Sequence, residues 1–259
     1  MKFLSRNEVS VSIPMKSKNG VYVESKEAKD NTFFHATLWK KAPGCTVNSK
    51  PWTNILVQNW GKLVGRMHSV TSKYKPNRKF RRPEWNQIFS MKELKKDLIN
   101  HKDIIEKQFE LNIYLESLPK TKESYGMIHS DIESENIFVK DNQLMLIYFD
   151  DCQYNWFVFD IAVILRASTW QMQNRNNHKD PLKWFFGNFM KGYLSIYKIG
   201  ERWLRELPIM LRVIELRSFI HALTKVDRSK FSDIERDWFK KSRESILEGK
   251  PMVDINRCF

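Results

Sequence analysis

Apolar and polar residues alternate along the amino-terminal part of the chain, which predicts β-strands. The alternation runs through Val9–Pro14, resumes in VYVES after Asn19–Gly20, and is followed by an apolar segment at Thr32–Trp39. Asn-Gly is a common hairpin turn. Pro43–Gly44 then breaks the pattern, so we expect a small β-rich unit over residues 1–41.

Beyond residue 41 the apolar positions recur at helical spacing, which predicts a mostly helical unit over 42–259. The first predicted helix has its apolar face at Trp52, Ile55, Leu56, Leu63 and Met67. The second, Met91–Leu118, has Leu94, Leu98, Ile105, Phe109, Ile113 and Leu115 in register. Later helices are expected near Trp156–Trp170, Pro181–Ile199, Leu204–Val226 and Ser232–Glu248, with Pro181 and Ser232 as suitable starts.

A pair of strands interrupts this helical unit. The segments IFVK and LMLIYF flank Asp141–Gln143, which predicts a β-hairpin with its turn at those residues. The fold class is therefore predicted to be α+β, with a small β-rich unit and a larger helical unit that carries one inserted hairpin.

The chain is basic, with a net charge of +14. Lys73–Arg82 contains six cations and no acid, so it could bind nucleic acid or phosphate; a solvated loop is the better supported interpretation. No nucleic-acid-binding motif surrounds it, and nucleic acid is therefore an unfavoured partner.

Three cysteines without a CxxC pair predict neither a disulfide framework nor a zinc site, and favour a reducing, cytoplasmic compartment. The start of the chain lacks the apolar core of a signal peptide. The most apolar run, WFVFDIAVIL, is too short to span a membrane and contains Asp160, so no membrane partner is expected.

The segment from Tyr125 to Leu165 carries the candidate chemistry. His129 and Asp131 are followed by Asn136, five residues after the aspartate, and then by the predicted hairpin. His-x-Asp with a later Asn is the layout of a kinase catalytic loop. Phosphoryl transfer needs an acid that accepts the proton of the attacking hydroxyl and an oxygen ligand for magnesium, which would be Asp131 and Asn136.

This segment resembles the aminoglycoside and choline kinase-like phosphotransferase family, which has a protein-kinase-like two-lobe fold. The likeness rests on the loop from His129 to Asn136, the acidic run YFDD, and FDIA at Phe159–Ala162. It implies ATP and Mg²⁺ as cofactors and a small-molecule hydroxyl as substrate. It also implies that His129 supports the catalytic loop and that Asp160 braces it by accepting hydrogen bonds.

The same resemblance implies a hinge that holds adenine at the end of the last strand of the small lobe. Those positions correspond to Leu38, Trp39 and Lys40. His68, on the helix that follows, is interpreted as a packing or surface residue.

The chain departs from the family pattern at several positions. Ser130 replaces a glycine and Glu133 replaces a histidine. Tyr148 replaces the aspartate that bridges magnesium to the phosphates, and a phenol is a poor ligand for that cation. Asp150 and Asp151 are candidate substitutes; Asp150 is favoured because alternate residues of a strand share a side, although it would lie roughly 6.5 Å further along the strand.

Two further family elements, a glycine-containing nucleotide loop and a strand lysine, have no recognisable counterpart. We therefore expect the small lobe to be incomplete at its amino terminus. Lys2, Lys16 and Lys18 are weak candidates for the lysine. An alternative to an active kinase is a catalytically impaired homologue that acts by binding; the sequence indicates neither the acceptor nor the oligomeric state.

Overall fold

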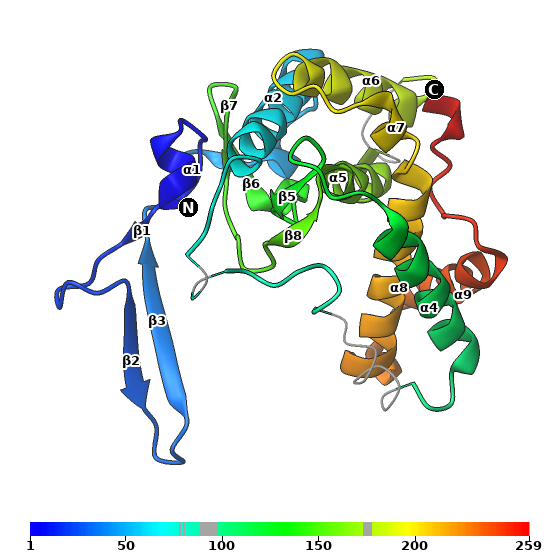
Figure 1. The fold of residues 1–259 in the computed structure, drawn as a ribbon, viewed down its shortest axis with the longest axis horizontal. Helices are drawn as coiled ribbons and strands as arrows, with labels where there is room; N and C mark the ends of the chain where they lie inside the picture. The colour runs from blue at the N-terminus through cyan, green and yellow to red at the C-terminus, as the bar shows by residue number, and fades with distance from the viewer. Residues whose placement is uncertain (78, 80, 89–97, 173–177, 259) are drawn as a thin grey trace.

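The computed structural model describes residues 1–259 except 78, 80, 89–97, 173–177 and 259, and has the predicted α+β class (Figure 1). The helices are α1 (Lys2–Arg6), α2 (Asn54–Thr71), α4 (Lys102–Ser117), α5 (Phe157–Met172), α6 (Pro181–Leu194), α7 (Glu201–Leu204), α8 (Leu207–Lys225) and α9 (Asp233–Glu248). The strands are β1 (Pro14–Met15), β2 (Val23–Glu27), β3 (Phe33–Trp39), β4 (Cys45–Thr46), β5 (Tyr125–Ile128), β6 (Ile137–Lys140), β7 (Gln143–Leu146) and β8 (Gln153–Trp156).

Strands β1, β3 and β2 form an antiparallel sheet in that order, and β2 and β3 extend away from the helices in Figure 1. The hairpin turn between β2 and β3 closes where the N–H of Ala28 donates to the carbonyl of Thr32 at 2.8 Å. Asn19–Gly20 does lie in a turn, closed by Ser17 N and Val21 O at 2.8 Å. It joins β1 to β2, which are not neighbours because β3 lies between them, so a hairpin of adjacent strands at this turn is a wrong prediction.

The predicted strand Val9–Pro14 is also largely wrong. Only Pro14 belongs to β1, whereas Val11 makes a single parallel bridge to Leu146 in β7. The backbone of Ser10 and Ser12 hydrogen-bonds to Leu146 at 3.0 Å, so this segment attaches to the hairpin of the helical part. The buried valines of the segment explain its alternating pattern.

The inserted hairpin is confirmed as β6 and β7, and β4 extends it into a three-stranded sheet. Asp141 and Asn142 both have left-handed backbone, with φ of 50° and 58°, as a two-residue type I′ turn requires. Strands β5 and β8 pair antiparallel beside it. They were not predicted, because strands buried on both faces lack the alternating pattern.

Helix α5 forms the centre of the helical part and packs against α6 and α8. No helix in the described ranges has the length and apolar character needed to cross a membrane. The predicted helix Leu204–Val226 is confirmed as α8, which begins at Leu207 after the separate short helix α7, and Pro208 lies in the first turn of α8, where a proline is tolerated. The predicted start at Ser232 is confirmed by a capping box with Glu235.

Helix α4 begins at Lys102, residues 98–100 form a turn, and 91–97 lie outside the described residues. Its predicted apolar face is partly wrong: Phe109 and Ile113 are exposed, as is Ile55 of α2. The buried side of α4 consists of Ile104, Gln108, Leu111 and Leu115. This side contacts α8 and α9. The positions of these two helices therefore decide which apolar residues of α4 are buried.

Helices α2 and α6 approach closely at glycines. A Cβ atom added to Gly192 would lie 1.9 Å from the carbonyl oxygen of Gln58, and one added to Gly61 would lie 2.0 Å from that of Phe189. No side chain fits these spaces unless the helices move apart. This contact holds His68 of α2 near Tyr193 of α6, a pair that matters for the site described below.

We expect Gly192→Ala to lower the free energy of unfolding by about 1–3 kcal/mol, because the added methyl forces the two helices apart. The matched control is Gly187→Ala in the same helix, where nothing lies within 4 Å of an added Cβ. That control gains up to about 1 kcal/mol from helix propensity. Urea unfolding measures both, and equal shifts in the two variants would contradict the close-packing account.

Candidate active site

The loop between β5 and β6 places Asp131 and Asn136 side by side. The side-chain amide of Asn136 donates to Oδ2 of Asp131 at 2.7 Å and to its carbonyl oxygen at 2.8 Å. A short 3-10 helix, Ser134–Asn136, turns the chain so that residues five apart can meet. The two residues that the motif singles out are therefore in direct contact.

Asp160 lies beneath this loop with its side chain completely buried. Its Oδ1 accepts a hydrogen bond from the backbone N–H of Ser130 at 2.7 Å, and Oδ2 accepts one from the N–H of His129 at 3.0 Å. Nε2 of His68 donates to Oδ2 at 3.1 Å. A buried carboxylate is costly without such donors, and here all three come from the loop and from α2.

His68 is part of this network, although its sequence position identified it only as a packing or surface residue. Its ring is completely buried, stacks on Phe157 with 4.6 Å between centroids, and hydrogen-bonds through Nδ1 to the hydroxyl of Tyr193 at 2.9 Å. Burial raises the pKa of Tyr193 well above its ordinary value, so the phenol keeps its proton. A lone histidine on a helix gave no signal of these partners.

His129 is oriented by hydrogen bonds on both ring nitrogens. Nδ1 accepts from the backbone N–H of Asp131 at 3.3 Å, so Nε2 carries the hydrogen that is donated to the carbonyl of Ile147 at 2.8 Å. The ring packs on Phe149 with 4.4 Å between centroids. His129 thus connects the loop to the residues that follow β7.

Ser130 has left-handed backbone, with φ of 73°, which explains why the family pattern has glycine at this position. A non-glycine residue there costs about 1–3 kcal/mol. Two hydrogen bonds offset that cost: the N–H of Ser130 donates to Asp160, and the amide of Gln153 donates to the serine hydroxyl.

Burial raises the pKa of the Asp131 carboxyl above its ordinary value, and the nearby carboxylates of Asp151 and Asp160 raise it further. His129 and the hydrogen bond from Asn136 lower it in part. The carboxylate therefore has more affinity for a proton than an exposed aspartate has, which suits a group that accepts one.

Tyr148 is 66 % exposed and has left-handed backbone, with φ of 60°. Aromatic residues rarely adopt this conformation, whereas aspartate and asparagine tolerate it better. Tyrosine is therefore unfavourable at position 148 for two reasons: the backbone there is left-handed, and a phenol is a poor ligand for Mg²⁺.

The two candidate substitutes for the metal-binding aspartate, Asp150 and Asp151, differ in their position relative to Asp131. Asp131 lines a cavity of about 560 Å³ together with Asp151, and Asp150 is not among the residues of its wall. The backbone carbonyl of Asp150 accepts a hydrogen bond from Arg82. Strand β7 ends at Leu146, so the alternation of a strand does not extend to these aspartates.

The oxygen donors near Asp131 suit a divalent cation that arrives with a phosphate ligand. Within the described ranges no three His, Cys, Asp or Glu side chains come together to hold a metal ion. Magnesium commonly uses one or two carboxylates and completes its shell with phosphate oxygens and water. Asp151 and the amide oxygen of Asn136, which accepts no hydrogen bond from the described residues, fit that requirement.

The predicted hinge, Leu38 to Lys40, lies at the end of β3, where the N–H of Lys40 donates to the carbonyl of Ile13 at 2.9 Å. These residues are not in the wall of the cavity at Asp131. Lys2 and Lys16 both lie over the ring of Tyr22. Adenine binding at the hinge stays a prediction.

The basic segment Lys73–Arg82 also has structural contacts. Arg82 donates to the carbonyl of Cys152 at 2.9 Å, and Arg81 lies over the ring of Tyr154 at 4.6 Å. Positions 78 and 80 of this segment are outside the described residues. Two of its cations are thus used to fix the chain beside β8.

We expect Asp160→Asn to destabilise the protein by about 3–5 kcal/mol, because an amide in place of the carboxylate leaves buried donors without an acceptor. Asp141→Asn is a matched control at an exposed turn position where asparagine is tolerated, and it should change stability by less than about 0.5 kcal/mol. Guanidinium unfolding measures the difference; similar stabilities for the two variants would contradict the brace.

Comparison with known proteins agrees with this geometry. The model of a family described as "Phosphotransferase enzyme family" matches residues 3–207. Amicoumacin kinase of Bacillus subtilis (strain 168) is 28 % identical over 255 residues, which are 98 % of this chain and 76 % of the relative.

Two solved structures have a similar fold. An amicoumacin kinase in complex with AMP-PNP, Ca²⁺ and Ami is 25 % identical, with a TM-score of 0.89 over 100 % of this chain and 78 % of its own. A microcompartment-associated aminopropanol kinase is 17 % identical, with a TM-score of 0.70 over 96 % and 76 %. The resemblance predicted from Tyr125 to Leu165 is confirmed: the chain belongs to the phosphotransferase enzyme family and has a kinase-like fold.

Proposed function

We propose that the protein transfers the γ-phosphoryl group of ATP to a hydroxyl group of a small molecule. The contact between Asp131 and Asn136, on a loop fixed by Asp160 and open to a cavity, is the observation that carries this proposal. The similar kinase whose structure holds AMP-PNP and Ca²⁺ supports the use of a nucleotide with a divalent cation.

Asp131 is the proposed catalytic base. Its carboxylate would accept the proton of the acceptor hydroxyl as the oxygen attacks the γ-phosphorus and ADP leaves. The amide of Asn136 holds Oδ2 at 2.7 Å and so leaves Oδ1 for the hydroxyl. His129 and Asp160 are positioning residues, because they bind the loop backbone.

Asn136 and Asp151 would hold Mg²⁺, which when bound supplies positive charge to the phosphate oxygens. This assignment keeps Asn136 and replaces Asp150 by Asp151, the aspartate in the wall of the cavity. The protein's own contribution is then to hold two oxygen donors next to the base.

The tyrosine at position 148, in place of a metal-binding aspartate, favours the alternative: a protein that binds ligands without turnover. Loss of one metal or charged contact typically lowers a rate about 10²–10³-fold. Such a loss slows phosphoryl transfer and does not by itself abolish it. Whether this site is active therefore depends on the rate of phosphoryl transfer, and two substitutions test it.

We expect Asp131→Asn to lower kcat/KM about 10²–10⁴-fold, because the amide cannot accept the proton. The assay follows ADP release with MgATP and trial acceptors, including amicoumacin and amino alcohols. Asp150→Asn is the matched control and should retain most of the activity. An Asp131→Asn variant with more than about a tenth of wild-type turnover would show that another group is the base.

We expect Tyr148→Asp to bind MgATP at least about tenfold more tightly, because it adds a carboxylate at the metal position. Tyr148→Asn separates the two effects of this residue: it relieves the left-handed backbone without adding charge, and should raise stability but not affinity. Calorimetry with and without Mg²⁺ measures the affinity. Equal affinities of wild type and Tyr148→Asp would refute the assignment of position 148.

A further inference from the structure

The cavity at Asp131 contains charged side chains that the proposed transfer does not use. Its volume is about 560 Å³, and its wall is formed by the catalytic loop, α5 and α8. Besides Asp131 and Asp151, the wall includes Glu133 from the loop and Arg166 from α5. The question is what these two groups bind.

Arg166 is partly buried and makes no hydrogen bond or ion pair with any residue in the described parts of the chain. Burial lowers the pKa of its guanidinium, although Glu133 and Glu215 oppose this effect. Oε2 of Glu215 accepts hydrogen bonds from Ser245 at 3.1 Å and Met252 at 3.2 Å, so Glu215 acts on Arg166 through its charge and not through a hydrogen bond. A partly desolvated guanidinium is stabilised by a planar anion that fits its donors, and a carboxylate is such an anion.

Arg217, the other arginine of this wall, is engaged in the fold. It donates to the carbonyl of Trp85 at 3.0 Å, and its guanidinium lies 5.4 Å from the ring centroid of Phe159. Arg166 is therefore the better placed of the two arginines to receive an anion from the cavity.

Glu133 is a partly buried carboxyl group that a cationic group would stabilise. Burial and the neighbouring Asp131 raise the pKa of its carboxyl, while Arg166 lowers it. Glu133 and Arg166 interact electrostatically, yet within the described structure they do not come within the 4.0 Å of an ion pair. Two opposite charges thus share one open cavity without pairing, which leaves room for a ligand that carries both.

We propose that the acceptor is a zwitterion: its carboxylate binds Arg166, its ammonium binds Glu133, and its hydroxyl lies at Asp131. This inference rests on the proposed function, in which the acceptor is the molecule whose hydroxyl receives the phosphoryl group. A purely cationic acceptor would bring positive charge next to Arg166 and supply no acceptor for its guanidinium, and a purely anionic one would meet Glu133, Asp131 and Asp151 without compensation.

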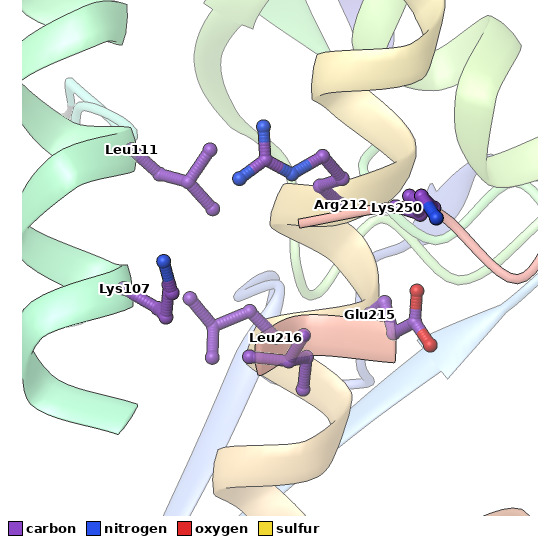
Figure 2. Close-up of a pocket in the computed structure, with 7 residues that line it drawn as sticks. Lys107, Leu111, Arg212, Glu215, Leu216 and Lys250 are labelled. Carbon is purple, nitrogen blue, oxygen red and sulfur yellow. The ribbon is translucent and has the colours of Figure 1, made fainter. Parts of the chain in front are cut away.

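A second cavity is also lined by charged side chains but is too small to bind a zwitterion. It lies between α4 and α8, is lined by Lys107, Arg212, Glu215 and Lys250, and is shown in Figure 2. Its volume is about 10 Å³, which is space for at most one water molecule. Arg212 is therefore a matched control for Arg166: it is an arginine that lines a cavity but has no room for a ligand beside it.

Three probes test the charge requirement, since they share one hydroxyl and differ only in charged groups. L-threonine carries both charges, 1-amino-2-propanol lacks the carboxylate, and 3-hydroxybutyrate lacks the ammonium. Calorimetry without nucleotide should give threonine a Kd at least about tenfold lower than either other probe. Equal values, tighter binding of 1-amino-2-propanol, or no binding of threonine at about 10 mM would overturn the proposal.

Variants assign the two contacts. Arg166→Met should weaken threonine binding about tenfold and should not weaken that of 1-amino-2-propanol, whereas Glu133→Gln should weaken threonine binding and should not weaken that of 3-hydroxybutyrate. Arg212→Met should alter none of them. Loss of preference in Arg212→Met, or its retention in Arg166→Met, would contradict the assignment.

ADP release with MgATP separates this inference from the proposed function. Charge-selective binding without ADP release would leave the zwitterion site standing and would refute transfer. ADP release with acceptors of any charge, without selective binding, would refute the zwitterion site and leave transfer standing.

Discussion

The carboxylate of Asp160 is the interaction on which the site depends. It accepts hydrogen bonds from the backbone of His129 and Ser130 and from the ring of His68, which in turn bonds to Tyr193. One buried charge thereby connects the catalytic loop, α5, α2 and α6. Because a buried carboxylate is stable only with all its donors in place, the position of the loop is coupled to the packing of three helices.

The loop and the hairpin could be predicted because their signals are local. The spacing from His129 to Asn136 and the turn residues Asp141–Asn142 each lie within a few positions of the chain. His68 could not be predicted, since it lies 92 residues before Asp160 and enters the network only through the packing of α2 in the folded chain. The spacing of residues along the chain does not indicate hydrogen-bond partners that are brought together by helix packing.

Other misses have the same origin. The buried side of α4 was misplaced because it depends on where α8 and α9 lie. Asp150 was favoured over Asp151 on the expectation that the strand continues, whereas β7 ends at Leu146, so the choice between these two aspartates stays a prediction. Strands β5 and β8 went unpredicted because both are buried. In each case the missing information is which neighbour covers a segment, and the neighbours come from distant parts of the chain.

The site combines an ordered base with an unusual metal position and a cavity of mixed charge. Tyr148 bears on the rate, while Arg166 and Glu133 bear on the choice of acceptor, so the two questions are separable. The central claim is transfer of a phosphoryl group to a hydroxyl, and ³¹P NMR of the protein with MgATP and hydroxyl compounds tests it most directly. The account predicts loss of the γ-phosphate signal with a new phosphomonoester resonance and ADP; unchanged ATP, or inorganic phosphate alone, would contradict it.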